Sequence, residues 1–260
     1  MNAQLHVGIW QSTGAGREIA ANLDEVGRAA GEAKRLGVDL LVLPECFVTG
    51  YYFEGDVAEI AADIGPDVIS RLVALSAAEG VALAVGSYEN GEGCVHNGAF
   101  IVTPEHGHVG TYRKRALFGD WERRTFTPGR DPFLFDFKGF RIGLNICYDI
   151  EFPERVRELA RAGADLVICP TAVMAPYDMV PRCLVQARAF ENHLFVAYAN
   201  RVGTEGPLHY LGLSRIAGPA GNVVAEAGEG PELIHAVLAL ADRDAARQDY
   251  DYLDDLARQV

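Results

Sequence analysis

Cys147 ends an apolar run that begins at Phe140, and the more polar sequence Tyr-Asp-Ile-Glu follows it directly. This pattern indicates a strand that ends in a sharp turn, with a helix starting near Pro153. A thiol at such a corner is expected at the exposed rim of a sheet, where a substrate can reach it. The turn also leaves the backbone N–H of Tyr148 free to bind an oxyanion. We therefore expect Cys147 to be a nucleophile rather than a buried structural thiol.

Two other predicted strands end in charged residues that suit a thiol hydrolase. Glu45 follows an apolar strand, and crowding by apolar neighbours raises the pKa of a carboxyl group toward the range of a general base. Lys114 ends another strand, where its ammonium would stabilise negative charge on a carbonyl oxygen and favour a thiolate. Glu122, eight residues later, could position Lys114 or a substrate amide. For each of the three, a solvated surface charge is the alternative interpretation.

The overall composition indicates a soluble globular protein and disfavours several partners. The chain has 260 residues, 49% of them hydrophobic and 23% charged, which suits one domain with one core. Its net charge of −13 would repel phosphate backbones and anionic membranes. We therefore expect a small-molecule substrate and neither a nucleic-acid nor a membrane partner.

The cysteines and histidines show no metal-binding or disulfide pattern. Five cysteines are scattered along the chain without CxxC pairs, at positions 46, 94, 147, 169 and 183. Three histidines considered as ligands, His96, His193 and His209, are far apart in sequence. We expect no metal, no cofactor and a reducing, cytoplasmic environment. No secretion signal is visible at the N-terminus, and no apolar run approaches the roughly 20 residues that span a bilayer.

The hydrophobic pattern predicts alternating strands and helices, with hairpins in the middle of the chain. Helices are predicted at 17–36, 69–79, 154–162 and 179–192. Strands are predicted at 5–10, 39–43, 81–87, 96–102, 109–113, 133–137, 140–146, 166–169, 195–200, 214–217, 222–225 and 232–238, followed by a polar tail at 242–260. Mixed βα units and hairpins within one core favour an α/β class of stacked sheets with helices outside.

Several motifs together resemble the nitrilase, or carbon–nitrogen hydrolase, superfamily. They are Leu43-Pro-Glu45, Tyr112-Arg-Lys114, Thr127-Pro-Gly129, the stretch from Gly143 to Glu154, and Tyr198-Ala-Asn-Arg201. The resemblance implies an αββα four-layer sandwich and a single domain over 1–260. It also implies a Glu45–Lys114–Cys147 triad, with Glu122 matching an additional glutamate of amidase members. A homodimer is implied too, with the 242–260 tail used in its packing.

The sequence after Cys147, Tyr-Asp-Ile-Glu-Phe-Pro-Glu, resembles the branch with aliphatic and stereoselective amidases. This implies hydrolysis of small carboxamides to a carboxylic acid and ammonia through a thioester. Tyr51, Tyr148, Thr171 and Ala172 are the expected substrate-binding residues, and the mostly apolar 171–174 stretch suits a short uncharged acyl group.

Other functions remain open from the sequence. Within the superfamily the alternatives are a nitrilase or an N-carbamoyl hydrolase. Outside it they are a non-catalytic binding protein, or a thiol redox sensor with Cys169 as the resolving thiol.

Overall fold

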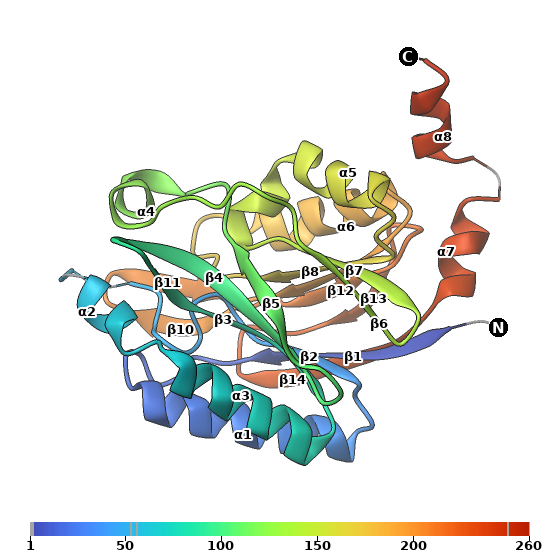
Figure 1. Cartoon of the computed structure of the whole chain (residues 1–260). Coiled ribbons are helices and arrows are strands. Elements are labelled where there is room, and N and C mark those ends of the chain that lie inside the picture. Colours follow the sequence, from blue (N-terminus) through green and yellow to red (C-terminus); the bar gives the residue numbers. More distant parts are fainter. Residues whose placement is uncertain (1–2, 53, 56, 249, 260) are drawn as a thin grey trace.

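The computed structural model describes residues 3–52, 54–55, 57–248 and 250–259 of the chain. Two six-stranded sheets pack face to face, and helices cover the outer side of each (Figure 1). Helices α1 (Ile19–Arg35) and α3 (Pro66–Glu79) cover one sheet. Helices α5 (Pro153–Arg161) and α6 (Val185–Phe190) cover the other. This is the predicted αββα four-layer sandwich.

The first sheet has the strand order β14-β1-β2-β3-β4-β5. Its strands are β14 (Glu232–Ala239), β1 (Gln4–Gln11), β2 (Leu40–Val42), β3 (Ala82–Gly91), β4 (Cys94–Thr103) and β5 (Gly107–Arg113). The strands β1, β2 and β3 run parallel, whereas β14, β4 and β5 are paired antiparallel to their neighbours.

The second sheet has the order β13-β12-β9-β8-β7-β6. Its strands are β13 (Val223–Glu226), β12 (Arg215–Ala217), β9 (Phe195–Ala199), β8 (Leu166–Pro170), β7 (Phe140–Leu144) and β6 (Leu134–Phe137). The central strands β7, β8 and β9 are parallel, as β1 to β3 are in the first sheet. Each sheet therefore has a parallel centre and antiparallel edges.

The central strands are continuously apolar because both of their faces are buried. In β2, Leu40 and Val42 face the core between the sheets, while Leu41 packs under the helices. In β8, Leu166 and Ile168 face the same inner core. The carboxyl ends of these strands meet at one end of the molecule, where the N–H of Glu45 donates to the carbonyl of Thr171 (3.3 Å).

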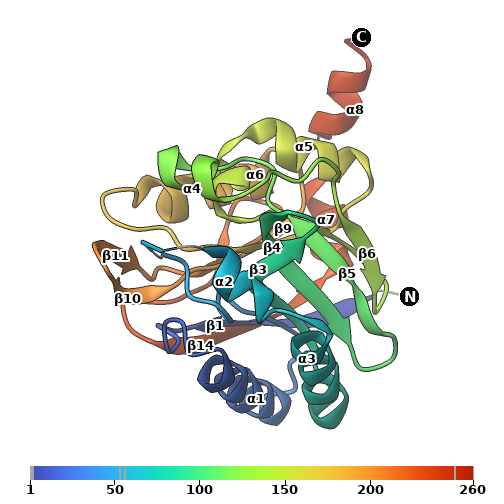
Figure 2. The same cartoon turned by 60° about the vertical axis from the view of Figure 1, so that its left-hand side comes forward.

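The sequence patterns missed four short elements that lie together at this end of the molecule. They are α2 (Val57–Ala62), α4 (Gly119–Thr125), β10 (Val202–Glu205) and β11 (Leu208–Leu211). Figures 1 and 2 show them beside the ends of the sheets. Each has seven residues or fewer, too short for a 3.6- or 2-residue period to stand out. The predicted helix at 179–192 is also interrupted, because a π-turn at Val180–Leu184 precedes α6.

The predicted polar tail contains two further helices, α7 (Leu240–Ala246) and α8 (Tyr252–Ala257). Residues 249 and 260 of the tail, and Met1 and Asn2 of the predicted domain, lie outside the described residues. In the described part of the chain, no helix is both long and apolar enough to cross a membrane.

Candidate active site

The three residues singled out at strand ends lie between the two sheets. Glu45 follows β2, Lys114 follows β5, and Cys147 follows β7. Cys147 has a positive φ of 46° and begins a 3-10 turn, Cys147–Glu151. A non-glycine residue in this backbone region is strained, and such strain persists where the surrounding structure imposes it. The predicted sharp corner at Cys147, followed by a helix from Pro153, is therefore confirmed.

Lys114 lies between two carboxylates. Its Nζ donates to Oε1 of Glu45 (2.7 Å) and to Oε1 of Glu122 (2.6 Å). All three side chains are shielded from solvent. An ammonium between two buried carboxylates is held at a fixed place, because any displacement lengthens one of two charge-assisted hydrogen bonds. The predicted proximity of Glu45, Lys114 and Glu122 is observed, and the surface-charge interpretation is wrong for all three.

One carboxylate oxygen of Glu45 accepts hydrogen bonds, and the other accepts none. Its Oε1 accepts from Lys114 and from Nδ2 of Asn97 (2.7 Å), whereas Oε2 is buried and has no hydrogen-bond partner in the described structure. A buried acceptor without a partner is costly and calls for a functional explanation. Asn97 was not foreseen, although a polar residue in the apolar strand β4 is a recognisable signal.

Two contacts hold the backbone around Glu45. Gly86 of β3 lies so close that an added Cβ would be 2.3 Å from the carbonyl oxygen of Pro44 and 2.7 Å from Cα of Glu45. Only glycine allows this approach. On the other side, the buried guanidinium of Arg201 reaches the carbonyl groups of Glu45 (3.4 Å) and Cys46 (3.2 Å). The carboxylate is thus carried on a rigid segment.

Burial and mutual interaction set the protonation of this cluster. Burial raises the pKa of Glu45 above its ordinary value, Lys114 partly offsets this, and Glu122 adds to it. Burial lowers the pKa of Lys114, but the charges of Glu122 and Glu45 outweigh burial and raise that pKa well above its usual range. Lys114 therefore stays cationic, and Glu45 becomes a stronger base than an ordinary carboxylate, as expected from its apolar setting.

Cys147 is more enclosed than the sequence suggested. It is 7% exposed, and Asp149, expected to mark an exposed rim, is fully buried. Burial and the charge of Glu45 raise the pKa of the Cys147 thiol well above its ordinary value, although Lys114, the Thr171 hydroxyl and the Ala172 backbone lower it. Lys114 lowers the pKa of the thiol, as expected of a neighbouring cation, but burial outweighs this effect. The resting thiol is protonated and needs a base.

Asp149 ties the Cys147 turn to the segment after Lys114. Its carboxylate accepts from the hydroxyl of Tyr112 (2.8 Å) and from the backbone N–H groups of Ile146 (3.0 Å) and Ala116 (2.7 Å). One buried side chain therefore holds the turn after Cys147 against the end of β5. The sequence analysis did not predict this role of Asp149.

Glu122 lies on α4, one of the short elements. Besides Lys114, its Oε1 accepts from the hydroxyl of Tyr51 (2.6 Å), and its Oε2 accepts from the backbone N–H of Phe118 (2.6 Å). Tyr51, predicted as a pocket wall, both lines the cavity beside Cys147 and supports this carboxylate.

A small cavity opens beside Cys147. It contains about 250 Å³ of space unoccupied by atoms, including the part open to solvent. Its walls are Tyr51, Phe118, Cys147, Glu151, Ala172, Val173, Met174 and Tyr177. Tyr51 and the 171–174 stretch were predicted to line it, and Ala172, Val173 and Met174 of that stretch do. Phe118, Glu151 and Tyr177 were not predicted as walls. The carboxyl group of Glu151 adds a charged group to the mostly apolar wall that was expected from the 171–174 stretch.

The other two predicted binding residues lie beside the cavity rather than in its wall. Thr171 is buried under Cys147, where its hydroxyl interacts with the thiol and with the hydroxyl of Tyr198 (3.1 Å). The ring of Tyr148 packs edge-on against Phe118 and Phe152. Its N–H is at the start of the 3-10 turn, where backbone donors lack partners within the helix.

The motif at 198–201 holds one wall of the cavity in place. The side chain of Asn200 accepts from the N–H of Val173 (2.8 Å) and donates to the carbonyl groups of Val173 (3.2 Å) and Gly212 (2.7 Å). The wall that follows β8 is therefore fixed by side-chain hydrogen bonds. Among the described residues, no group of three or more His, Cys, Asp or Glu side chains could hold a metal ion.

Comparisons with known proteins agree with this geometry. The family model described as "Carbon-nitrogen hydrolase" matches residues 7–248. The chain is 38% identical to an (R)-stereoselective amidase from Pseudomonas sp., over 91% of this chain and 84% of that protein. The crystal structure of an amidase from Nesterenkonia sp. has a TM-score of 0.88 and 33% identity, covering 100% of this chain and 97% of that one. A mutant of the Nesterenkonia sp. AN1 amidase in complex with butyramide has a TM-score of 0.86 and 32% identity, covering 99% and 97%.

Proposed function

The chain belongs to the carbon–nitrogen hydrolase family and is an amidase of the nitrilase superfamily, and we propose that Cys147, Glu45 and Lys114 carry out its reaction. The observation that supports this proposal most directly is the buried Glu45–Lys114–Glu122 cluster beside the Cys147 cavity. A protonated thiol, a carboxylate with an uncommitted oxygen and a fixed cation are the parts of acyl transfer to sulfur.

In the proposed acylation, Oε2 of Glu45 takes the proton of the Cys147 thiol as Sγ attacks the amide carbonyl carbon. The tetrahedral oxyanion is held by the ammonium of Lys114 and the backbone N–H of Tyr148. Glu45 then passes the proton to the departing nitrogen, so that the carbon–nitrogen bond breaks and ammonia leaves. The product is a thioester on Cys147.

In the proposed deacylation, Glu45 removes a proton from water as the water oxygen attacks the thioester carbonyl. Collapse of the second oxyanion breaks the carbon–sulfur bond, and the proton returns to the Cys147 sulfur. The carboxylic acid then leaves. Glu122 keeps Lys114 aligned through both steps, since it is held in turn by Tyr51 and the Phe118 N–H.

Small carboxamides are the proposed substrates. Butyramide and propionamide should release ammonia faster than the matching nitriles or N-carbamoyl compounds, because the chain is similar to amidases, one of which is known in complex with butyramide. Ammonia release from equal concentrations of each compound measures this order. A preference for nitriles would make the protein a nitrilase, and no turnover of any of the three classes would favour a binding role.

The carboxylate of Glu151 in the cavity wall predicts a preference for a positively charged acyl group, which the same ammonia assay can test. The ammonium of 3-aminopropionamide replaces the terminal methyl group of butyramide with little change in shape. A carboxylate among aromatic rings favours a cation, so we expect the aminated amide to have the higher kcat/KM. Glu151→Gln should reduce this preference while butyramide turnover changes little; an unchanged preference would exclude Glu151 from recognition of the acyl group.

The acid limb of the pH profile should depend on Glu122. Glu45 must be ionised to act as a base, so activity falls as pH decreases through its raised pKa. The charge of Glu122 contributes to raising that pKa, so Glu122→Gln should move the acid limb of kcat/KM to lower pH. Glu45→Gln should instead lower the rate by at least about 10²-fold at every pH. An acid limb that stays in place in Glu122→Gln would contradict the coupling.

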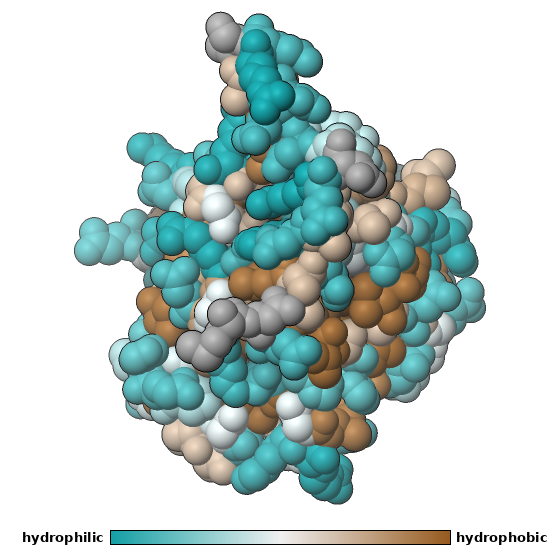
Figure 3. Space-filling model, turned by 90° about the vertical axis from the view of Figure 1, so that its right-hand side faces the viewer, coloured by the Kyte–Doolittle hydropathy of each residue, from teal (hydrophilic) through white to brown (hydrophobic). Residues whose placement is uncertain are grey.

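We also propose a homodimer that uses the 242–260 tail. Helices α7 and α8 extend from the layered body (Figure 1), have only seven and six residues, and contain no buried residue among those described. Only partly buried side chains, such as Leu253, pack these helices against the body, and short helices depend on packing for stability in water, so a partner surface would stabilise them further. Apolar side chains gather on the face beside the tail (Figure 3), and Val224 and Val237 line a groove with Ala245 of α7.

Sedimentation equilibrium should give a mass of about twice the 28.1 kDa of one chain, and removal of the tail should lower it toward that of the monomer. A monomeric mass at all concentrations would exclude the dimer. A cytoplasmic location is proposed as well, since all five cysteines are free and a reducing compartment would keep them so.

A further inference from the structure

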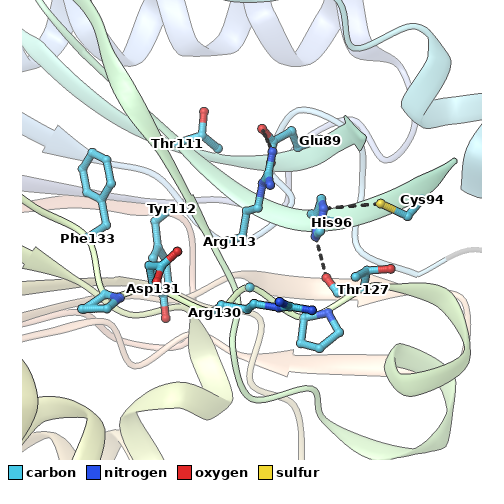
Figure 4. A pocket seen from close by; sticks show the side chains of 13 residues that line it. Glu89, Cys94, His96, Thr111, Tyr112, Arg113, Thr127, Arg130, Asp131 and Phe133 are labelled. Carbon is cyan, nitrogen blue, oxygen red and sulfur yellow. Dashed lines mark hydrogen bonds and ion pairs between the residues drawn. The ribbon is translucent and has the colours of Figure 1, made fainter. Parts of the chain in front are cut away.

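A second cleft lies beside β3, β4 and β5, with walls different from those of the Cys147 cavity. It contains about 1140 Å³ of space unoccupied by atoms, including the part open to solvent. Cys94 and His96 of β4 line it together with Arg113 of β5 and the segment at 127–133 (Figure 4). The proposed amidase reaction uses none of these side chains.

The hydrogen bonds of His96 determine its tautomer. Its Nδ1 is 2.6 Å from the carbonyl oxygen of Thr127. A carbonyl oxygen only accepts, so Nδ1 carries the hydrogen, and in the neutral ring Nε2 has a free lone pair. Sγ of Cys94 lies 3.5 Å from Nε2, and the thiol is therefore the donor in this pair (Figure 4). His96 is 6% exposed, so its ring is held in this orientation.

The residues around Cys94 and His96 allow the two side chains to approach each other and leave Cys94 accessible from the cleft. An added Cβ at Gly91 would lie 2.8 Å from Sγ of Cys94 and 3.3 Å from Nε2 of His96, so the glycine allows the sulfur to approach the ring. Cys94 is partly exposed and borders the cleft, unlike Cys46 and Cys169, which are buried. It therefore has both a positioned base and a route for a reagent.

Two guanidinium groups border the same cleft. Arg113 is fixed by two hydrogen bonds to Glu89 (2.6 and 3.0 Å) and lies close enough to Cys94 for their charges to interact. Arg130 is exposed and forms no ion pair with any residue that the structure describes. An unpaired guanidinium attracts carboxylates, so Arg130 favours reagents that carry them.

We propose that Cys94 is a second reactive thiol, a modification site for low-molecular-weight disulfides that carry carboxylates. Nε2 of His96 takes the thiol proton, and the Cys94 thiolate attacks one sulfur of the disulfide. A new sulfur–sulfur bond forms to Cys94 as the disulfide bond of the reagent breaks. The departing thiolate receives the proton from His96 and leaves as a thiol, so Cys94 is oxidised and the reagent is reduced.

Glutathione disulfide tests this site on the intact chain, with Cys183 as an internal control. Cys183 is exposed and its thiol has no hydrogen bond to a described residue, so it reports the reactivity of an unassisted thiol. The Cys147→Ala background removes the active-site thiol. Mass spectrometry of unreduced peptides should show the mixed disulfide at Cys94 forming at least about tenfold faster than at Cys183 near pH 7. Equal rates at the two residues would refute the proposal.

Two further measurements distinguish the contribution of His96 as a base from that of Arg130 as a cation. His96→Gln should bring the Cys94 rate close to that of Cys183, with unchanged circular dichroism as the folding control. Cystamine, a disulfide with ammonium groups, should show a smaller rate advantage at Cys94 over Cys183 than glutathione disulfide does, and Arg130→Gln should narrow the difference between the two reagents. A His96→Gln variant that folds and reacts at the wild-type rate would overturn the role of the histidine. An equal advantage for cystamine would overturn the preference for carboxylates.

Discussion

Cys147→Ala is expected to abolish ammonia release from butyramide, with a loss of at least about 10⁴-fold in kcat. The reason is that the proposed thioester requires a nucleophile, and the remaining carboxylate and ammonium only stabilise charge. Intact-mass measurement during turnover of a slowly hydrolysed amide should show an acyl adduct on the wild-type chain and none on the variant. The substitution removes one sulfur from a small cavity, so the variant should fold normally.

Cys169→Ala and Cys183→Ala are the matched controls. Cys169 also follows an apolar run and lies close to the backbone of Cys147, but it is buried in the layer between the second sheet and its helices and does not line the cavity. Its loss should reduce stability modestly and leave the adduct on Cys147. Cys183 is exposed, and its loss should change neither the stability of the fold nor the adduct on Cys147. Near-normal turnover by Cys147→Ala would refute the proposed nucleophile, and turnover lost equally in Cys169→Ala would point to a resolving-thiol mechanism.

The layers and the three strand-end residues could be predicted because long periodic segments determine them. The run before Cys147 is apolar at almost every position, and this is the pattern of a strand buried on both faces, as β7 is for most of its length. The ends of parallel strands meet at one edge, so residues at those ends come together even when they are far apart in sequence. Glu45 and Lys114 meet in this way over a sequence separation of 69 residues, and Glu122 joins them from α4.

The walls of the site could not be predicted because they come from short, irregular pieces. Phe118 directly precedes α4, and Tyr177 lies in the segment before the π-turn. Tyr210 of β11 closes the cluster around Tyr51. These positions depend on long-range contacts such as the bridge between Met174 and Tyr210, and no local period encodes them. The degree of burial of Cys147 follows from the same walls, which is why the sequence suggested a more exposed thiol.

Lys114→Met is expected to remove activity and also to destabilise the fold, more than any other single change in this site. The methionine fills a similar volume, but the carboxylates of Glu45 and Glu122 lose the ammonium between them and remain buried. Removing one partner from a buried ionic cluster typically costs about 3–5 kcal/mol. Turnover should fall by at least about 10²-fold as well, because the oxyanion loses its cation. Chemical unfolding and ammonia release measure the two effects separately.

The stability loss should depend on pH in a direction that the cluster determines. Lys114 lowers the pKa of Glu45, so its removal raises that pKa further above the value in the unfolded chain. A carboxyl group with a raised folded-state pKa stabilises the fold below its unfolded pKa, and this stabilisation is lost as pH rises through the folded pKa. The deficit of Lys114→Met relative to wild type should therefore shrink as pH falls. Lys34→Met, which breaks an exposed pair with Glu79, should cost at most about 1 kcal/mol. A Lys114→Met deficit that is constant with pH would show that lost packing, rather than an uncompensated carboxylate, destabilises the variant.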